Sequence, residues 1–146
     1  MKNSIKMLIT PTMLVILCFC SISLPAFAAT KSHEYKSILE FKGEHQGATR
    51  NYKYKNIKFS ATAKSYIGST EIPSSNTYYS KTYTVSLYRD NGLFSKEKIG
   101  SKKLSRYSAD SAKWTNIGKG NYYFYFTKAR DGVTVKSKNV VMKSYQ

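Results

Sequence analysis

Side chains able to do acid–base or nucleophilic chemistry are scarce in this sequence of 146 residues. It holds two histidines, His33 and His45, and eight carboxylates that stand singly. A serine triad would need His45 to meet a serine and an aspartate, but the sequence contains no G-x-S-x-G elbow to indicate that serine. No spacing favours the paired carboxylates of a glycosidase. The sequence therefore predicts a protein that is not an enzyme.

The same residues give little support for a metal or a cofactor. His33-Glu34 and Glu44-His45 could converge on a divalent ion, but neither dipeptide has the ligand spacing of a zinc site on one element. The glycines fit turns rather than a phosphate-binding loop. We therefore expect both histidines to be exposed in an N-terminal arm or loop, and we expect no metal and no cofactor.

Basic residues dominate the charge of the chain. Lysine and arginine number 24 against 8 acidic residues, a formal net charge of +16. Such a field concentrates polyanions and makes their association fast and salt-sensitive. A simpler alternative is that the charge only keeps a β-rich chain soluble and protects its sheet edges.

Tyrosines are interleaved with this charge in YKYK, residues 52–55, and in FYFTKAR, residues 124–130. Basic side chains would attract an anionic ligand, while outward tyrosines would stack on sugar rings or lie at a membrane interface. The candidate binding residues are Tyr52, Lys53, Tyr54, Lys55, Tyr123, Tyr125, Lys128 and Arg130.

The first 28 residues have the three parts of a secretory signal peptide. Lys2 and Lys6 form the basic region, an apolar run follows, and Ala26-x-Ala28 gives a cleavage site. Pro11 interrupts the apolar run early, which favours cleavage over retention as a membrane anchor. We expect residues 29–146 to be secreted.

Both cysteines lie in this leader, so the expected mature chain of 118 residues has none and carries a formal charge of +14. A secreted chain that does without disulfides fits a Gram-positive bacterium, and we expect it to associate with the cell wall. Its length suits one domain with one core, and we expect a monomer.

Strand patterns fill the predicted mature region, and no window sustains an apolar period typical of a helix. In NIKFSATAK the alternate residues Ile57, Phe59, Ala61 and Ala63 should face the core. In KTYTVSLYR the inward set should be Tyr83, Val85 and Leu87.

A hairpin should follow, because DNG at residues 90–92 is a strong turn signal. The return arm has Ile99 and Leu104 as anchors and a bulge at Gly100. Residues 42–50 are expected to form a loop and residues 68–76 an unstructured connector.

The stretch NYYFYF, residues 121–126, contains five aromatic residues and alternates with a period of two. Tyr122, Phe124 and Phe126 share one face, which should be the core face, and Tyr123 and Tyr125 should point outward.

The tyrosines of YKYK leave two possibilities open. A continuous strand would expose Tyr52 and Tyr54, because their parity is opposite to that of Ile57 and Phe59. A bulge near Asn56 would instead return both tyrosines to the core.

Short strands joined by tight turns predict an all-β domain of about seven strands, either an antiparallel sandwich of immunoglobulin-like or transthyretin-like form or a small barrel. The segment WTNIGKGNYYF, residues 114–124, resembles the corner of transthyretin-like and Cna B-type sandwiches. In that arrangement Trp114 and Ile117 enter the core, Gly118 and Gly120 turn the chain, and Tyr122 caps the next strand.

Three functions follow as expectations. The first is a secreted, cationic, non-enzymatic sandwich that binds an anionic envelope or extracellular component, such as teichoic acid or anionic lipid. The second is an antibacterial protein, since the chain is similar to small β-sandwich bacteriocins in size, secretion and charge. The third is an extracellular nucleic-acid binder, because single strands require basic and aromatic residues together.

Overall fold

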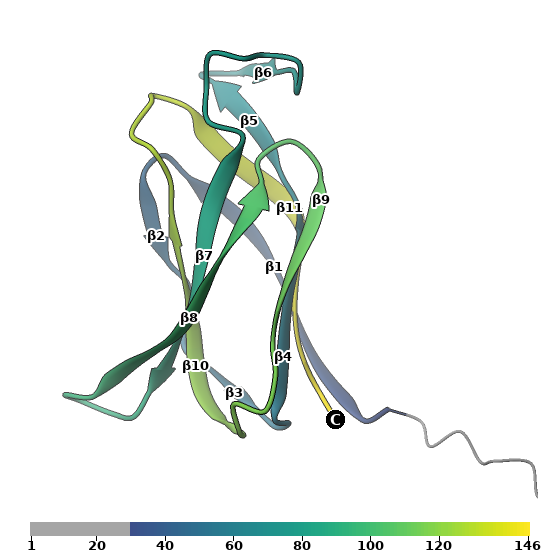
Figure 1. The fold of residues 1–146 in the computed structure, drawn as a ribbon, viewed down its shortest axis with the longest axis vertical. Coiled ribbons are helices and arrows are strands. Elements are labelled where there is room, and N and C mark those ends of the chain that lie inside the picture. Colours follow the sequence, from purple (N-terminus) through teal and green to yellow (C-terminus); the bar gives the residue numbers. More distant parts are fainter. Residues whose placement is uncertain (1–29) are drawn as a thin grey trace, which may run out of the picture.

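The protein folds as two antiparallel sheets packed face to face (Figure 1). The computed structural model describes residues 30–146, so the predicted leader lies outside the described residues. Within this part of the chain there is no helix, and hence none long and apolar enough to cross a bilayer. The predicted all-β class and the sandwich are confirmed.

Eleven strands form the two sheets, rather than about seven. They are β1 (Ser32–Phe41), β2 (Glu44–Gln46), β3 (Arg50–Tyr52), β4 (Asn56–Thr62), β5 (Lys64–Ile67), β6 (Thr70–Ile72), β7 (Thr82–Asp90), β8 (Lys96–Ser105), β9 (Ala109–Trp114), β10 (Gly120–Thr127) and β11 (Thr134–Tyr145). Short strands explain the difference: β2 lies within the stretch predicted as a loop, β3 begins at the last residue of that stretch, and β6 lies within the predicted connector.

Long central strands organise both sheets. In the first sheet β11 pairs with β1 on one side and with β5 and β4 along different stretches of the other, while β6 and β9 extend the sheet outward. In the second sheet β10 pairs with β2 and β3 on one side and with β7 on the other, and β8 follows β7. Both sheets are open, so each has free edge strands.

The core lies between the sheets and follows the period-two patterns of the sequence. The inward residues predicted on β4 and β7 are all buried, as are Tyr122, Phe124 and Phe126 on β10. The β7–β8 hairpin also forms as predicted, with Leu104 buried. Its register shift falls at Ile99, which has no partner on β7, rather than at the adjacent Gly100, which pairs with Leu87.

Tyr52 belongs neither to a continuous strand with Ile57 nor to a strand with a bulge near Asn56. It ends β3, which pairs with β10 in the second sheet, whereas Asn56 begins β4 in the first sheet. The chain therefore crosses between sheets at residues 53–55, and the two parities belong to different sheets. Tyr52 is buried in the core, and Tyr54 is half-buried on the crossing segment.

The corner before β10 has the expected form. Trp114 is buried and Ile117 packs against the core. Gly118 and Gly120 have φ angles of 83° and 153°, which favour glycine. The Tyr122 hydroxyl donates a hydrogen bond of 2.7 Å to the Ile117 carbonyl, so this tyrosine fixes the turn to the strand that follows it.

The histidines do not lie in an arm or loop, so that expectation was wrong. His33 is half-buried in β1, where its ring meets Tyr35 edge-on with centroids 4.7 Å apart. His45 is exposed in β2 and stacks on Phe126 at 6.1 Å. Both belong to strands because the backbones of β1 and β2 pair with β11 and β10.

Candidate anion-binding surface

An open depression lies where the chain crosses between the sheets. Its volume is about 350 Å³, and it is lined by Lys53, Tyr54, Lys55, Lys119 and Gln146. The first three are predicted binding residues. The β9–β10 loop brings Lys119 to them, because its Ile117 N–H donates to the Lys55 carbonyl at 2.9 Å.

A row of lysines continues from this depression over the outer face of the first sheet. Lys143 on β11 is the register partner of Lys58 on β4, and Lys58 is the partner of Lys113 on β9. Their sequence neighbours on these strands face the core, so the three lysines point outward. Like charges directly opposite one another are destabilising, which makes this lysine row costly unless an anion lies over it.

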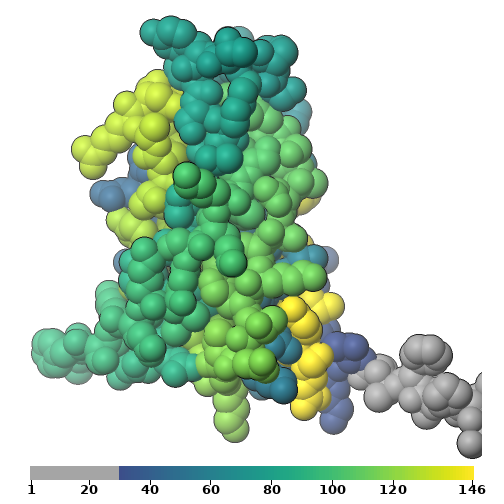
Figure 2. Space-filling view, viewed as in Figure 1, coloured from purple at the N-terminus to yellow at the C-terminus, as the bar shows by residue number. Residues whose placement is uncertain are grey.

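We call the depression and the row together the cationic end. Its basic residues are Lys53, Lys55, Lys58, Lys113, Lys119 and Lys143. The register pair Asn56 and Tyr145 joins the two parts, because Asn56 lies two residues before Lys58 on β4 and Tyr145 lies two residues after Lys143 on β11. In Figure 2 the yellow C-terminal residues mark this end at the bottom of the molecule.

Acidic side chains are nearly absent from the cationic end. Among residues 30–146, none of its six lysines forms an ion pair with a carboxylate. The nearest acidic register partner is Glu34, opposite Lys143, and that carboxylate lies 3.9 Å from Lys36 Nζ. Carboxylates of the described residues therefore neutralise little of the positive charge at the cationic end.

Tyr123 points outward as predicted but is not a free stacking surface. Its ring stacks on Tyr88 with centroids 5.2 Å apart, and Lys96 Nζ lies 5.5 Å from its centroid. Only 4% of its surface is exposed, and burial raises the pKa of its hydroxyl. Because its neighbours occupy the ring faces, Tyr123 leaves the candidate set.

Tyr125 remains half-buried on the same outer face. Its hydroxyl donates a 2.7 Å hydrogen bond to Glu44, and this bond raises the pKa of the hydroxyl.

We predict that Tyr125→Ala leaves the urea midpoint of unfolding nearly unchanged, since little apolar surface is uncovered. Tyr123→Ala should lower the free energy of unfolding by about 2 kcal/mol. Equal losses in the two variants would mean that the outer face is covered along its whole length.

Burial also removes Tyr52 and Lys128 from the candidate set. Tyr52 lies within the core, where desolvation raises the pKa of its hydroxyl. The Lys128 side chain is fully buried, and its Nζ contacts Asp131 Oδ1 at 2.6 Å. Arg130 is exposed, but it follows the far end of β10 and so lies away from the cationic end.

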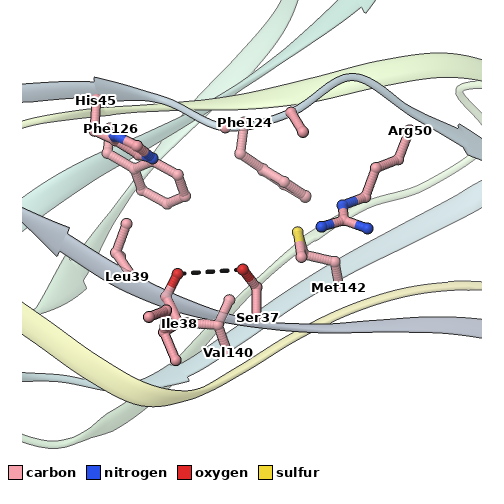
Figure 3. Close-up of a pocket in the computed structure, with 11 residues that line it drawn as sticks. Ser37, Ile38, Leu39, His45, Arg50, Phe124, Phe126, Val140 and Met142 are labelled. Atoms are coloured by element: carbon pink, nitrogen blue, oxygen red, sulfur yellow. Dashed lines mark hydrogen bonds between the residues drawn. The ribbon is translucent and has the colours of Figure 1, made fainter.

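A second, smaller cavity lies between the sheets at the β1 edge (Figure 3). Its volume is about 40 Å³, and its lining is mainly apolar, with Ser37, His45 and Arg50 as the polar exceptions. That volume holds about one water molecule, so the cavity is too small for a sugar or a nucleotide.

Metal-ligating side chains do not cluster in the described part of the chain. Within residues 30–146, no three His, Cys, Asp or Glu side chains gather as a metal would require. Neither histidine hydrogen-bonds to a carboxylate there, and the buried Nδ1 of His33 has no partner.

Comparison with known proteins gives no functional lead. No known protein family matches the chain, and no curated protein shows significant similarity to it.

Proposed function

We propose that this protein is a secreted, non-enzymatic β-sandwich that binds a phosphate-bearing anionic polymer of the cell envelope through its cationic end. The observation that carries this proposal is the row of Lys143, Lys58 and Lys113 across three adjacent strands. Neighbouring strands lie about 4.8 Å apart, so the row presents closely spaced positive charges. A polyanion laid over them would relieve their mutual repulsion.

The chemistry of the cationic end suits a flexible polymer with repeated charges. All six of its basic residues are lysines, whose compact charges on flexible stems adapt to phosphates at varied positions. The lysines extend from the depression to the outer face of the sheet, which favours an extended ligand over a single small anion. A teichoic acid, with its repeated phosphates, has this character.

Nucleic acid fits the same surface less well. Proteins that bind single strands without sequence preference stack successive bases on exposed aromatic rings. Tyr52 is buried and Tyr123 is covered by Tyr88 and Lys96, so Tyr54 is the one candidate tyrosine at the cationic end. Tyr54 and Tyr145, both half-buried, give little stacking surface for successive bases, which favours a polymer that carries none.

The proposal predicts that neutralising the lysine row weakens binding to cell walls. Lys58→Gln, Lys113→Gln and Lys143→Gln together should lower affinity for teichoic-acid-bearing walls about tenfold or more, because three positive charges that form no ion pair are removed. Co-sedimentation of the purified protein with Gram-positive walls, with and without teichoic acid and across a salt series, measures this.

A matched triple variant separates the row from net charge. Lys36→Gln, Lys64→Gln and Lys136→Gln remove the same charge, but these lysines already pair with Glu34, Glu71 and Glu40. This control should retain most of the affinity. Equal losses in both triple variants would assign binding to net charge alone, and binding that survives removal of teichoic acid would exclude the proposed ligand.

A further inference from the structure

The β7–β8 hairpin ends in two large apolar side chains that nothing in the described chain covers. Leu93 is 92% exposed and Phe94 is 99% exposed, and they are adjacent at the tip. A single exposed apolar residue is ordinary, whereas these two side by side form an exposed apolar patch at the end of a projecting hairpin.

The tip is a defined turn rather than a loose loop. The Asn91 N–H donates to the Ser95 carbonyl at 2.9 Å, and the Gly92 N–H donates to Asp90 Oδ1 at 3.2 Å. Gly92 has a φ of 107°, a conformation that favours glycine. Asp90 is also held from outside the hairpin, since the Thr49 hydroxyl donates to Oδ2 at 2.9 Å. The turn thus keeps Leu93 and Phe94 directed away from the sandwich.

The tip and the depression lie at the same end of the molecule. In Figure 1 the hairpin leaves the body at the lower end, where the β9–β10 loop, the β3–β4 crossing and the C-terminus also lie. Basic residues there outnumber acidic ones by six to two. They are Arg89, Lys96, Lys98, Lys53, Lys55 and Lys119, against Asp90 and Glu97.

We propose that this end docks on an anionic lipid bilayer, with Leu93 and Phe94 inserted among the acyl chains and the surrounding basic residues at the headgroups. Apolar insertion and attraction to anionic lipid strengthen each other at such interfaces. A hydrated phosphate polymer offers no apolar environment for these side chains, so this inference goes beyond the polymer-binding function. Two side chains are also far too small for a stable protein interface, which needs about 1,000 Å².

Vesicle binding tests the inference with the purified protein. It should co-sediment with vesicles of phosphatidylcholine and phosphatidylglycerol and much less with phosphatidylcholine alone. The double variant Leu93→Ser with Phe94→Ser should bind about tenfold or more weakly, because two apolar side chains no longer leave water. Tyr78→Ser is the matched control, since Tyr78 is 86% exposed on the connector before β7, at the opposite end of that strand.

A tryptophan reporter distinguishes insertion from adhesion by charge. Phe94→Trp should show blue-shifted emission with anionic vesicles and quenching by brominated acyl chains, whereas Tyr78→Trp should show neither. Absence of vesicle binding, or binding that is equal in the double-serine variant, would overturn the inference. So would self-association without lipid that the double-serine variant abolishes, since the tip would then contact a second copy. Lipid-free cell walls test polymer binding separately, so the two proposals can fail independently.

Discussion

Phe124→Ala will lower the free energy of unfolding by about 3 to 5 kcal/mol. Phe124 is buried at the centre of the aromatic core, where it joins the two sheets. Its ring centroid lies 5.2 Å from that of Phe59 and 5.8 Å from that of Trp114, both on the first sheet. Truncation leaves a cavity between these large rings, which cannot close over it without distorting both sheets.

The matched control makes the same substitution at the hairpin tip. Phe94→Ala removes the same atoms from a fully exposed position, so it should leave the urea midpoint unchanged. A domain of this size has a total stability of about 5 to 15 kcal/mol, so the loss at Phe124 is a large fraction of it. Equal midpoints for the two variants would contradict the assignment of Phe124 to the core.

The strand faces could be predicted because side-chain alternation is a local property. Ile57, Phe59 and Phe124 each appear at the correct parity within a single run of sequence, and each is buried. Tyr52 could not be assigned in this way, since the chain changes sheets between it and Asn56. Parity carries no information across such a crossing.

The candidate site was predictable only in part, for a related reason. Lys53, Tyr54 and Lys55 are consecutive, so a local pattern was enough to single them out. The lysine row depends on which strands are neighbours and on their register. Neither property can be predicted from the positions of Lys58, Lys113 and Lys143 in the sequence. The alternation of strand β4 predicts that Lys58 points outward, but it does not predict which lysines lie beside it.

The sequence also does not predict which side chains from other elements will cover an outward-facing residue. Tyr123 has the outward parity of a surface residue, yet Tyr88 from β7 and Lys96 from β8 lie over its ring. Lys128 looks like a charged flank of an aromatic strand, yet a carboxylate holds it inside the molecule. Each case depends on side chains from another element or from a turn whose path the sequence does not specify.

That carboxylate belongs to a buried ion cluster formed by Arg106, Lys128 and Asp131. Arg106 is fully buried in the turn between β8 and β9, and its Nη1 donates to Asp131 Oδ2 at 2.8 Å. Lys128 Nζ donates to the other carboxylate oxygen at 2.6 Å. Two buried cations thus share one acceptor, while Nε and Nη2 of Arg106 have no partner among the described residues.

Asp131→Ala will lower the free energy of unfolding by about 3 to 5 kcal/mol at neutral pH, because it leaves two buried positive charges without a counter-charge. Urea unfolding measures the loss. Glu71→Ala is the matched control, since it breaks an exposed pair with Lys64 of 2.9 Å and should leave the midpoint nearly unchanged. A loss at Asp131 no larger than that at Glu71 would show that the cluster is solvated.

The free energy of unfolding measured at acidic pH tests the same prediction in a second way. Burial raises the pKa of Asp131, but the hydrogen bonds from Arg106 and Lys128 outweigh burial and lower that pKa to about 2, from 3.8. Since the folded pKa lies below the unfolded value, the stabilisation is complete above about pH 4 and is lost as the pH falls toward 2. This shift corresponds to about 2 kcal/mol. The difference in stability between the wild-type protein and Asp131→Ala should therefore shrink across that window, and a constant difference would mean that Asp131 is not the acceptor that holds the two cations.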